Sequence, residues 1–195
     1  MRILVVYAHP LRESFAASLH GAILESLQGR GHDIDDLDLF AEGFDPVLPA
    51  EERAHYEDEA FPRAIDPHIA RLRAAEAIVL CFPTWWYGMP AILKGWFDRV
   101  WIPGVAFRLP EGGGMIVPAL THIRYFAVVT TYGSPWWFIR LVLRDPVRAV
   151  TMGGFRRLLS PKVRVDFLAF YNIDGASAAS RARFLERVRR HFVRI

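Results

Sequence analysis

The chain has 195 residues, of which 52% are hydrophobic; this is enough for one well-buried domain and too few for two, so we expect a single domain over residues 1–195. The net charge of +3 comes from arginines spread along the chain, a distribution that argues against a nucleic-acid partner. No apolar stretch approaches the roughly 18 residues that span a bilayer, and the single Cys81 excludes an internal disulfide, so we expect a cytoplasmic protein with no membrane span.

The first part of the chain alternates short apolar runs with helical patterns. An apolar, β-branched run over 3–7 is typical of a strand buried on both faces of a parallel sheet. Ser14 is a suitable N-cap for a helix that runs to residue 28 and ends at Gly29 or Gly31. The pattern then predicts a strand over 33–39, an acidic surface excursion with little regular structure over 41–62, and a helix over 66–75.

The rest of the chain repeats this alternation. We predict a buried strand over 77–82, a helix over 90–100, a Gly- and Pro-rich loop over 104–118, a strand over 125–131, a helix over 137–150 and a strand over 163–171. A last helix over 177–193 has an apolar stripe formed by Phe184, Leu185, Val188 and Phe192. Five strands that alternate with helices predict an α/β doubly wound parallel sheet, with strand order 2-1-3-4-5 and helices on both faces.

Ligands of open α/β sheets bind outside the carboxyl ends of the strands, near the switch in strand order. The loops that follow the first, third and fourth strands, over 9–18, 83–90 and 130–135, therefore form the expected site. The chain has no G-x-x-x-x-G-K-[ST] motif and no G-x-G-x-x-G after its first strand, which argues against a P-loop NTPase and a standard dinucleotide fold. Its histidines show no metal-binding motif, so we expect no metal.

The first of these loops leads into a helix. Its backbone amides and the helix dipole favour a phosphate over residues 14–17. Ser14 and Ser18 add hydroxyl donors, and His9 can hydrogen-bond a phosphate oxygen. The alternative is that Ser14 only caps the helix and that His9 is a satisfied side chain at the end of the strand.

Three consecutive aromatic residues, Trp85, Trp86 and Tyr87, stand in the second loop. A loop cannot bury all three on one side, whereas a flat ligand such as an isoalloxazine ring explains them. Pro83 and Gly88 stiffen the loop around such a ring. The alternative is that the aromatic residues cover the end of the sheet or pack against another subunit.

The third loop reads Thr130-Thr131-Tyr132-Gly133. Its hydroxyl groups can hydrogen-bond a ligand, and its glycine suits a place where the backbone must come close to one. By itself this loop is weak evidence for a bound ligand. Together, the three loops on one edge of the sheet favour a bound flavin nucleotide.

Three motifs of the chain resemble those of the NAD(P)H quinone oxidoreductases of the flavodoxin-like fold, the group of DT-diaphorase, the bacterial modulators of drug activity and the potassium-efflux ancillary proteins. The strongest lies between Pro83 and Trp101 and reads Trp-Tyr-Gly-Met-Pro-Ala-Ile-Leu-Lys-Gly-Trp-Phe-Asp-Arg-Val. The other two, in the family's order and spacing, are Tyr7-Ala8-His9-Pro10 with Ser14-Phe15, and Thr130-Thr131-x-Gly133. The resemblance covers essentially the whole chain.

This resemblance implies a flavodoxin-like fold, a homodimer with two active sites at the subunit interface, a tightly held FAD or FMN, and ping-pong transfer of hydride from NAD(P)H to a quinone or a related acceptor. By their position in the motifs, the residues at the cofactor phosphates are His9, Ser14, Phe15 and Ala17. Those that line the flavin ring are Pro83, Thr84, Trp85, Trp86 and Tyr87. Those that approach its other edge are Thr130, Thr131, Tyr132 and Gly133.

The chain departs from the family pattern at several positions. Ala16 stands where the family has Asn, which removes one side-chain hydrogen bond, and Tyr132 replaces the first Gly of Thr-Thr-Gly-Gly, which crowds the ring edge. Counting without gaps places Phe138 and Arg144 where diaphorases have the Tyr and His that assist charge transfer. Tyr132 and Arg144 are therefore the candidate catalytic residues, Arg144 as a charge that stabilises an anionic flavin or hydroquinone, unless it is simply an exposed helix arginine.

Two other functions share these features. A non-enzymatic electron carrier of the flavodoxin type has the same fold, but such carriers are typically acidic and this chain is basic. A regulatory ancillary flavoprotein of a potassium-efflux transporter would dock through a surface such as the arginine-rich last helix, which is otherwise only a solvated face. The sequence leaves open FAD or FMN, NADH or NADPH, and the identity of the acceptor.

Overall fold

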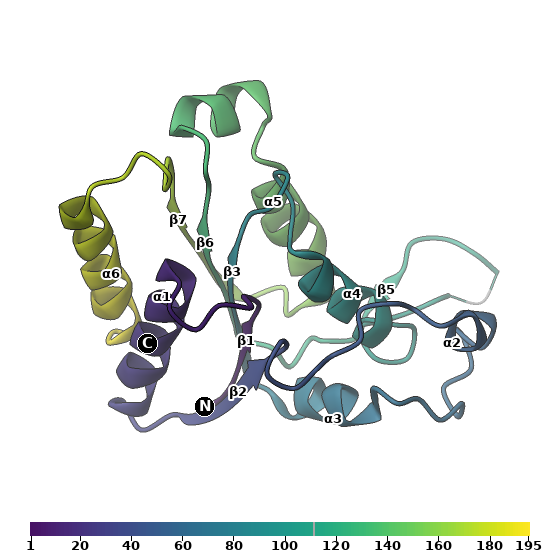
Figure 1. Ribbon diagram of the computed structural model, residues 1–195. Helices are drawn as coiled ribbons and strands as arrows, with labels where there is room; N and C mark the ends of the chain where they lie inside the picture. The colour runs from purple at the N-terminus through teal and green to yellow at the C-terminus, as the bar shows by residue number, and fades with distance from the viewer. Residues whose placement is uncertain (111) are drawn as a thin grey trace.

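The computed structural model describes residues 1–110 and 112–195. Its centre is a five-stranded parallel sheet in the order β2-β1-β3-β6-β7 (Figure 1). Counted in chain order, these strands stand as 2-1-3-4-5, which confirms the predicted doubly wound sheet. Their bounds are Arg2–Tyr7 for β1, Asp33–Asp38 for β2, Ala77–Pro83 for β3, Tyr125–Thr131 for β6 and Arg164–Phe170 for β7.

Helices cover both faces of the sheet. On one face, α1 (Phe15–Gln28) and α6 (Ala178–Phe192) lie side by side; on the other lie α3 (Asp66–Ala74), α4 (Ala91–Val100) and the segment 138–158 (Figure 1). Side chains of β1 alternate between the two layers. Ile3 and Val5 join the core under α1 and α6, whereas Leu4 and Val6 join the core under α3 and α4.

Helices α1 and α6 begin at the predicted residues. The side chain of Ser14 accepts a hydrogen bond from the amide of Ala17 at 3.1 Å, and that of Ser177 accepts one from the amide of Ser180 at 3.2 Å. Helix α1 ends at Gly29, one of the two expected stops. The predicted apolar stripe of α6 is buried at Phe184, Val188 and Phe192, with Leu185 packed beside it.

The acidic excursion over 41–62 is mostly irregular, as predicted, but it contains α2 (Ala50–Ala54) and reaches into the protein. Glu52 of this helix is buried, and its carboxylate accepts two hydrogen bonds from Arg99 of α4, at 2.6 and 3.1 Å. Arg99 also donates to the carbonyl oxygen of Asp45 at 2.6 Å. The description of this segment as a surface excursion was therefore wrong at Glu52, because the buried guanidinium of Arg99 requires a nearby carboxylate.

The Gly- and Pro-rich loop over 104–118 also contains regular structure that the sequence did not predict. Two-residue strands β4 (Phe107–Arg108) and β5 (Val117–Pro118) pair in the antiparallel sense. Strands this short carry no readable alternation of apolar and polar residues. Position 111 of the predicted loop lies outside the described residues.

The helix predicted over 137–150 is broken. Arg144 and Asp145 adopt left-handed backbone, with φ of 56° and 49°. Pro146 causes the break, because a proline disfavours helical backbone at the preceding residue and has no amide to donate. Asp145 then caps the next piece by accepting a hydrogen bond from the amide of Arg148 at 3.2 Å. The pieces are a π-helical turn (Phe138–Val142), α5 (Pro146–Arg148), a second π-helical stretch (Ala149–Gly154) and a 3-10 turn (Phe155–Leu158).

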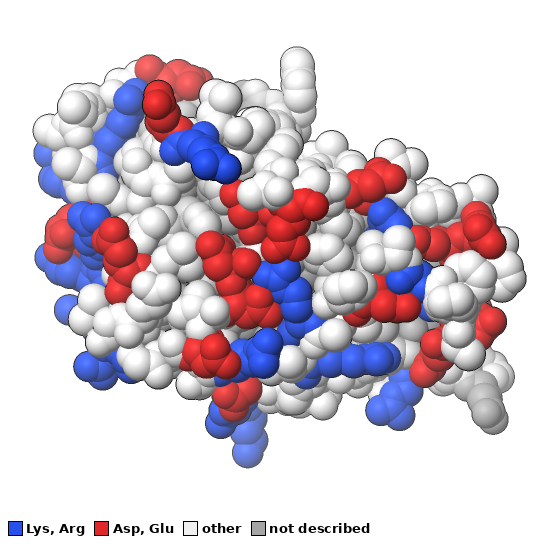
Figure 2. Space-filling view, turned by 60° about the horizontal axis from the view of Figure 1, so that its bottom comes forward, with Lys and Arg blue, Asp and Glu red and all other residues white. Residues whose placement is uncertain are grey.

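Charged side chains of both signs are mixed over the face shown in Figure 2. Basic and acidic groups lie next to one another there, so the excess of arginine does not form one continuous field on that face. Within the part of the chain that the structure describes, no helix is both long enough and apolar enough to cross a membrane.

Gly95 of α4 occupies a position that has no room for a side chain. A Cβ at this position overlaps the main chain and Cβ of Pro46. We expect Gly95→Ala to lower the free energy of unfolding by about 1–3 kcal/mol, because the segment around Pro46 must move.

Gly21 of α1 provides a matched control, because a Cβ there meets no atom within 4 Å. We expect Gly21→Ala to raise the free energy of unfolding by about 0.5–1 kcal/mol, since alanine loses less backbone freedom in a helix. Urea denaturation measures both variants. Equal changes in the two would contradict the close approach of Pro46 to α4.

Candidate active site

The loops that follow β1, β3 and β6 meet at the carboxyl edge of the sheet. In Figure 1 the loops after β3 and β6 rise toward the top, and the loop after β1 leads into α1 below them. Thr84 ties the second loop to the third, because its amide and its hydroxyl both donate to the carbonyl oxygen of Thr131, at 2.8 and 3.0 Å. His9 ties the first loop to the second, with its ring edge-on to Trp85 and the ring centroids 6.0 Å apart. The structure thus brings the three predicted loops together.

The amino end of α1 offers hydrogen-bond donors at this edge. Ser14 already satisfies the amide of Ala17. In residues 1–110 and 112–195, no acceptor meets the amides of Phe15 and Ala16. These two donors and the positive end of the helix dipole make a site for an anion.

The side chains of His9 and Phe15 are partly engaged within the fold. Nδ1 of His9 accepts a hydrogen bond from the amide of Leu11 at 3.0 Å. The ring of Phe15 packs against Phe170 of β7, with centroids 5.7 Å apart. At Phe15, contact with a phosphate is therefore left to the main chain.

The second loop is a tight turn with two aromatic residues at its tip. Trp85 and Gly88 exchange backbone hydrogen bonds of 3.1 and 3.0 Å. Trp86 and Tyr87 both have left-handed backbone, with φ of 50° and 61°, where Asn and Gly are the usual residues. Such backbone costs about 1–3 kcal/mol per residue and is concentrated at functional sites. Trp86 is 97% exposed, so the turn presents aromatic surface to a ligand or a partner.

A cavity opens between the second and third loops. It has a volume of about 190 Å³ and is lined by Thr84, Trp86, Tyr87, Tyr132, Gly133, Ser134 and Ile139. An apolar cavity of about 280 Å³ adjoins it through Tyr87 and is lined also by Gly88, Met89, Lys94, Pro146, Val147 and Val150. The predicted residues Pro83, Thr130 and Thr131 are buried at the strand ends behind these cavities.

Gly133 is the point of closest backbone approach in the third loop. A Cβ at this position lies 2.7 Å from Oδ2 of Asp174, which belongs to the loop after β7. The amide of Asn172 in that loop donates to the carbonyl oxygen of Ser134 at 3.0 Å. The loop after β7 therefore packs against the third loop, a contact that the sequence analysis missed.

The hydroxyl of Tyr132 is not available to a ligand. The residue is fully buried, and its hydroxyl donates to Oδ1 of Asp145 at 2.6 Å. Its ring stacks on Tyr171 with centroids 5.0 Å apart. Burial, reinforced by the hydrogen bond to Asp145, raises the pKa of this hydroxyl well above its ordinary value. The hydroxyl of Tyr132 thus holds the third loop to Asp145, and a role of this residue in catalysis stays a prediction.

A catalytic role for Arg144 likewise stays a prediction. The residue is exposed, lies in the left-handed break, and is not among the residues that line either cavity. Arg140 instead approaches the buried carboxylate, with its Nη1 3.5 Å from Oδ2 of Asp145. Phe138, at the other position counted from the family, packs near Tyr87 with centroids 6.1 Å apart. The Asp145-Pro146 pair was the sequence signal that could have revealed this break.

Cys81 lies in β3, behind the site. It is buried, and burial raises the pKa of its thiol, so it is a packing residue. Among the residues that the structure describes, no three His, Cys, Asp or Glu side chains gather in a way that could hold a metal ion.

A family model described as flavodoxin-like fold matches residues 1–192. The chain belongs to this flavodoxin-like family. The flavodoxin-like chain is 33% identical to the NAD(P)H oxidoreductase YcaK of Escherichia coli (strain K12) over 130 residues, which are 66% of this chain and 64% of the relative. It is 32% identical to NAD(P)H dehydrogenase (quinone) 1 of Rattus norvegicus over 123 residues, which are 54% of this chain and 45% of the relative.

A solved structure matches the flavodoxin-like chain over nearly its whole length. This is the NAD(P)H:quinone oxidoreductase from Methanothermobacter marburgensis, with a TM-score of 0.82, 27% identity, and coverage of 99% of this chain and 98% of that chain. The matches to the curated relatives cover less of each chain. The chain spans between 45% and 64% of the length of the first of them.

Proposed function

We propose that the chain is a flavin-dependent NAD(P)H dehydrogenase that passes reducing equivalents to a quinone or a related acceptor. The observation that carries this proposal is the meeting of an open helix N-terminus and an exposed aromatic turn on one edge of the sheet. Relatives named as NAD(P)H dehydrogenase (quinone) and NAD(P)H:quinone oxidoreductase support the same reaction. A cytoplasmic location belongs to the same proposal, because NAD(P)H is supplied there.

The residues at this edge fit a flavin nucleotide, either FAD or FMN. The free amides of Phe15 and Ala16 suit the phosphate, with Ser14 and His9 beside them. The turn over 85–88 suits one side of the ring, because its aromatic side chains are exposed and its backbone is fixed. Gly133 suits the other side, because it lines the cavity between the two loops through its main chain.

A bound flavin accepts a hydride from NAD(P)H and delivers two electrons to an acceptor. The chain itself binds and orients the reacting rings. Trp86 and Tyr87 provide flat surfaces against which rings stack. The hydrogen bonds between Thr84 and Thr131 hold the two ring-binding loops at a fixed separation. Orientation of this kind is the main contribution of a protein to direct hydride transfer.

The first test is the absorbance of the purified protein, followed by anaerobic addition of NADPH and then of menadione. We expect flavin bands near ~375 and ~450 nm that disappear with NADPH and return with menadione. The mass of the released cofactor distinguishes FAD from FMN. A colourless protein that binds no added flavin would contradict the proposal and would favour a regulatory role.

The N-cap serines of α1 and α6 provide a variant and its control for the contact with the phosphate. Ser14→Ala and Ser177→Ala each remove one helix cap, at a cost of about 1 kcal/mol in folding free energy. Only Ser14→Ala should also weaken flavin binding, by about tenfold, because it removes a hydroxyl donor from a charged phosphate. Equal flavin affinity in the two variants would place the phosphate elsewhere.

We infer in addition that the site is completed by a second copy of the chain. The cavity of about 190 Å³ is smaller than the roughly 300 Å³ at which small-molecule sites begin. Exposed apolar side chains stand in the second loop and in the segment 136–150, which both contribute residues to the two cavities, and exposed apolar patches mark interfaces. These side chains are Trp86, Trp136, Trp137, Leu141, Val142 and Val150.

The oligomeric state tests this homodimer. Leu141→Glu places a charge in the exposed patch and should give a monomer, because an unpaired charge is costly to bury at an interface. Val47→Glu is the control, since Val47 and Leu141 are both 68% exposed and Val47 lies outside the patch. Light scattering after size exclusion measures the mass. A wild-type monomer, or a dimer that survives Leu141→Glu, would count against this interface.

A further inference from the structure

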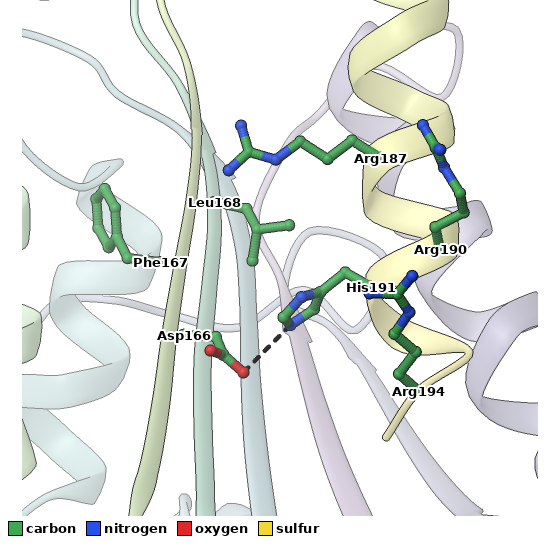
Figure 3. A pocket seen from close by; sticks show the side chains of 7 residues that line it. All are labelled: Asp166, Phe167, Leu168, Arg187, Arg190, His191 and Arg194. Carbon is green, nitrogen blue, oxygen red and sulfur yellow. Dashed lines mark ion pairs between the residues drawn. The ribbon is translucent and has the colours of Figure 1, made fainter.

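A second cavity, of about 390 Å³, lies between α6 and β7. It is separate from the loop site, because its strand residues Asp166 and Leu168 belong to the body of β7 and not to the carboxyl edge of the sheet. Figure 3 shows Arg187 extending from α6 toward β7, and Asp166 and Leu168 pointing from β7 toward the helix. We refer to this space as the α6–β7 cavity.

Arginine side chains dominate the α6–β7 cavity. Arg187, Arg190 and Arg194 stand at spacings of three and four along α6 and its C-terminal end, so they share one face. The carboxylate in the lining, Asp166, is already paired with Arg164 at 3.1 Å. Glu186 lies 3.5 Å from Arg190. The four arginines are Arg164, Arg187, Arg190 and Arg194. Against the carboxylates of Asp166 and Glu186 they leave two positive charges in excess.

His191 does not add to this excess charge. Its Nε2 lies 3.2 Å from Oδ2 of Asp166 and 3.1 Å from the hydroxyl of Tyr125. Burial lowers the pKa of the imidazole, although Asp166 acts in the opposite direction. The positive charge of the cavity therefore comes from arginines, which stay protonated at every physiological pH.

The edge of the sheet adds a backbone donor. β7 is the last strand of the sheet, and the amide of Arg164 donates to the carbonyl oxygen of Arg124 at 3.0 Å, toward β6. Because successive residues of a strand point their amides to opposite sides, the amide of Phe167 faces the open edge. The Phe167 side chain lies on the other side of the sheet, under the guanidinium of Arg148 (Figure 3). Phe167 therefore meets the cavity through its main chain.

From this arrangement we propose that the α6–β7 cavity binds a doubly charged phosphate group, carried by a small soluble compound or by a lipid headgroup. Guanidinium groups match phosphate oxygens two by two, which makes a cavity lined by three arginines a phosphate site in preference to a site for a neutral ligand. The volume lies within the roughly 300–1,000 Å³ of small-molecule sites. Arg187 extends from α6 toward β7 (Figure 3) and does not lie along the helix, so it does more than offset the dipole at the end of α6.

Calorimetric titration with inorganic pyrophosphate tests the soluble arm, and flotation with phosphatidylglycerol vesicles, against phosphatidylcholine vesicles, tests the headgroup arm. We expect saturable binding in at least one arm that weakens about tenfold or more in Arg187→Gln and in Arg194→Gln. Arg183→Gln is the matched control, because Arg183 is on the same helix but does not line the cavity; its affinity should stay within about twofold of wild type.

The two arms identify the source of the phosphate. Binding of pyrophosphate that depends on Arg187 assigns a soluble phosphate compound, and dependence on Arg187 in vesicle binding alone assigns a headgroup. The melting temperature and circular dichroism of each variant show whether it folds, because all three arginines lie near the surface of α6. Absence of saturable binding in both arms, or binding that Arg187→Gln and Arg194→Gln leave unchanged, would overturn the proposal.

Discussion

Glu52→Ala is expected to lower the free energy of unfolding by about 3–5 kcal/mol, because it leaves the guanidinium of Arg99 buried without a charge partner. Glu52 is 7% exposed and Arg99 is 4% exposed. The two side chains share two hydrogen bonds. An arginine does not become neutral by losing its proton, so the unpaired buried charge lowers the free energy of unfolding. Urea denaturation of the variant measures it.

Helix α4, which carries Arg99, also carries a control for this effect. Lys94 and Asp98 of α4 form an ion pair whose side chains are 59% and 46% exposed, and Asp98→Ala should change the free energy of unfolding by no more than about 0.5 kcal/mol. Replacing both buried partners, as Glu52→Leu with Arg99→Met, should recover part of the stability lost in Glu52→Ala. Similar losses for Glu52→Ala and Asp98→Ala would show that burial does not decide the strength of the pair.

Asp145→Ala is expected to cost about 2–4 kcal/mol of unfolding free energy, the sum of an unsatisfied buried hydroxyl at Tyr132 and a lost helix cap. Oδ1 of Asp145 accepts from the Tyr132 hydroxyl and from the amide of Arg148. Because Tyr132 stands beside Gly133 in the third loop, the same variant should also retain less flavin if the proposed function holds. Denaturation and flavin content are measured separately.

Asp145→Asn separates the hydrogen bonds of this residue from its charge. Its side-chain oxygen can still accept from Tyr132 and Arg148, and asparagine tolerates the left-handed backbone found at this position. The cost should therefore be about 1 kcal/mol, which reflects the weaker contact with Arg140. A loss as large as that of Asp145→Ala would assign the stabilisation to the charge of Asp145 and not to its two hydrogen bonds.

The parts of the fold that the sequence predicted are those with local causes. Unbroken apolar runs mark strands covered on both faces, and Ser14 and Ser177 mark the helices that they cap. The burial of Glu52 has a distant cause, since its partner Arg99 lies 47 residues away along the chain. An acidic segment rich in proline gives no local indication that one of its carboxylates is drawn inward.

In the candidate site, too, features with local causes could be predicted and features with distant causes could not. The three loops could be located because ligands of parallel sheets bind at the carboxyl ends of the strands. The direction of individual side chains could not be predicted, because it depends on tertiary partners. Tyr132 turns inward to a carboxylate that is placed by the break at Pro146, and the same break moves Arg144 off the helix on which it was expected.

The tip of the turn after β3 combines strained backbone with exposed aromatic side chains. Asn followed by Gly is the pair that best tolerates its backbone, yet Trp86 and Tyr87 occupy these positions. An engineer who ranks substitutions by folding energy alone would replace these two residues first. Heat resistance would improve while the stacking surface disappeared, so thermostable versions of this protein are better sought at positions remote from that turn.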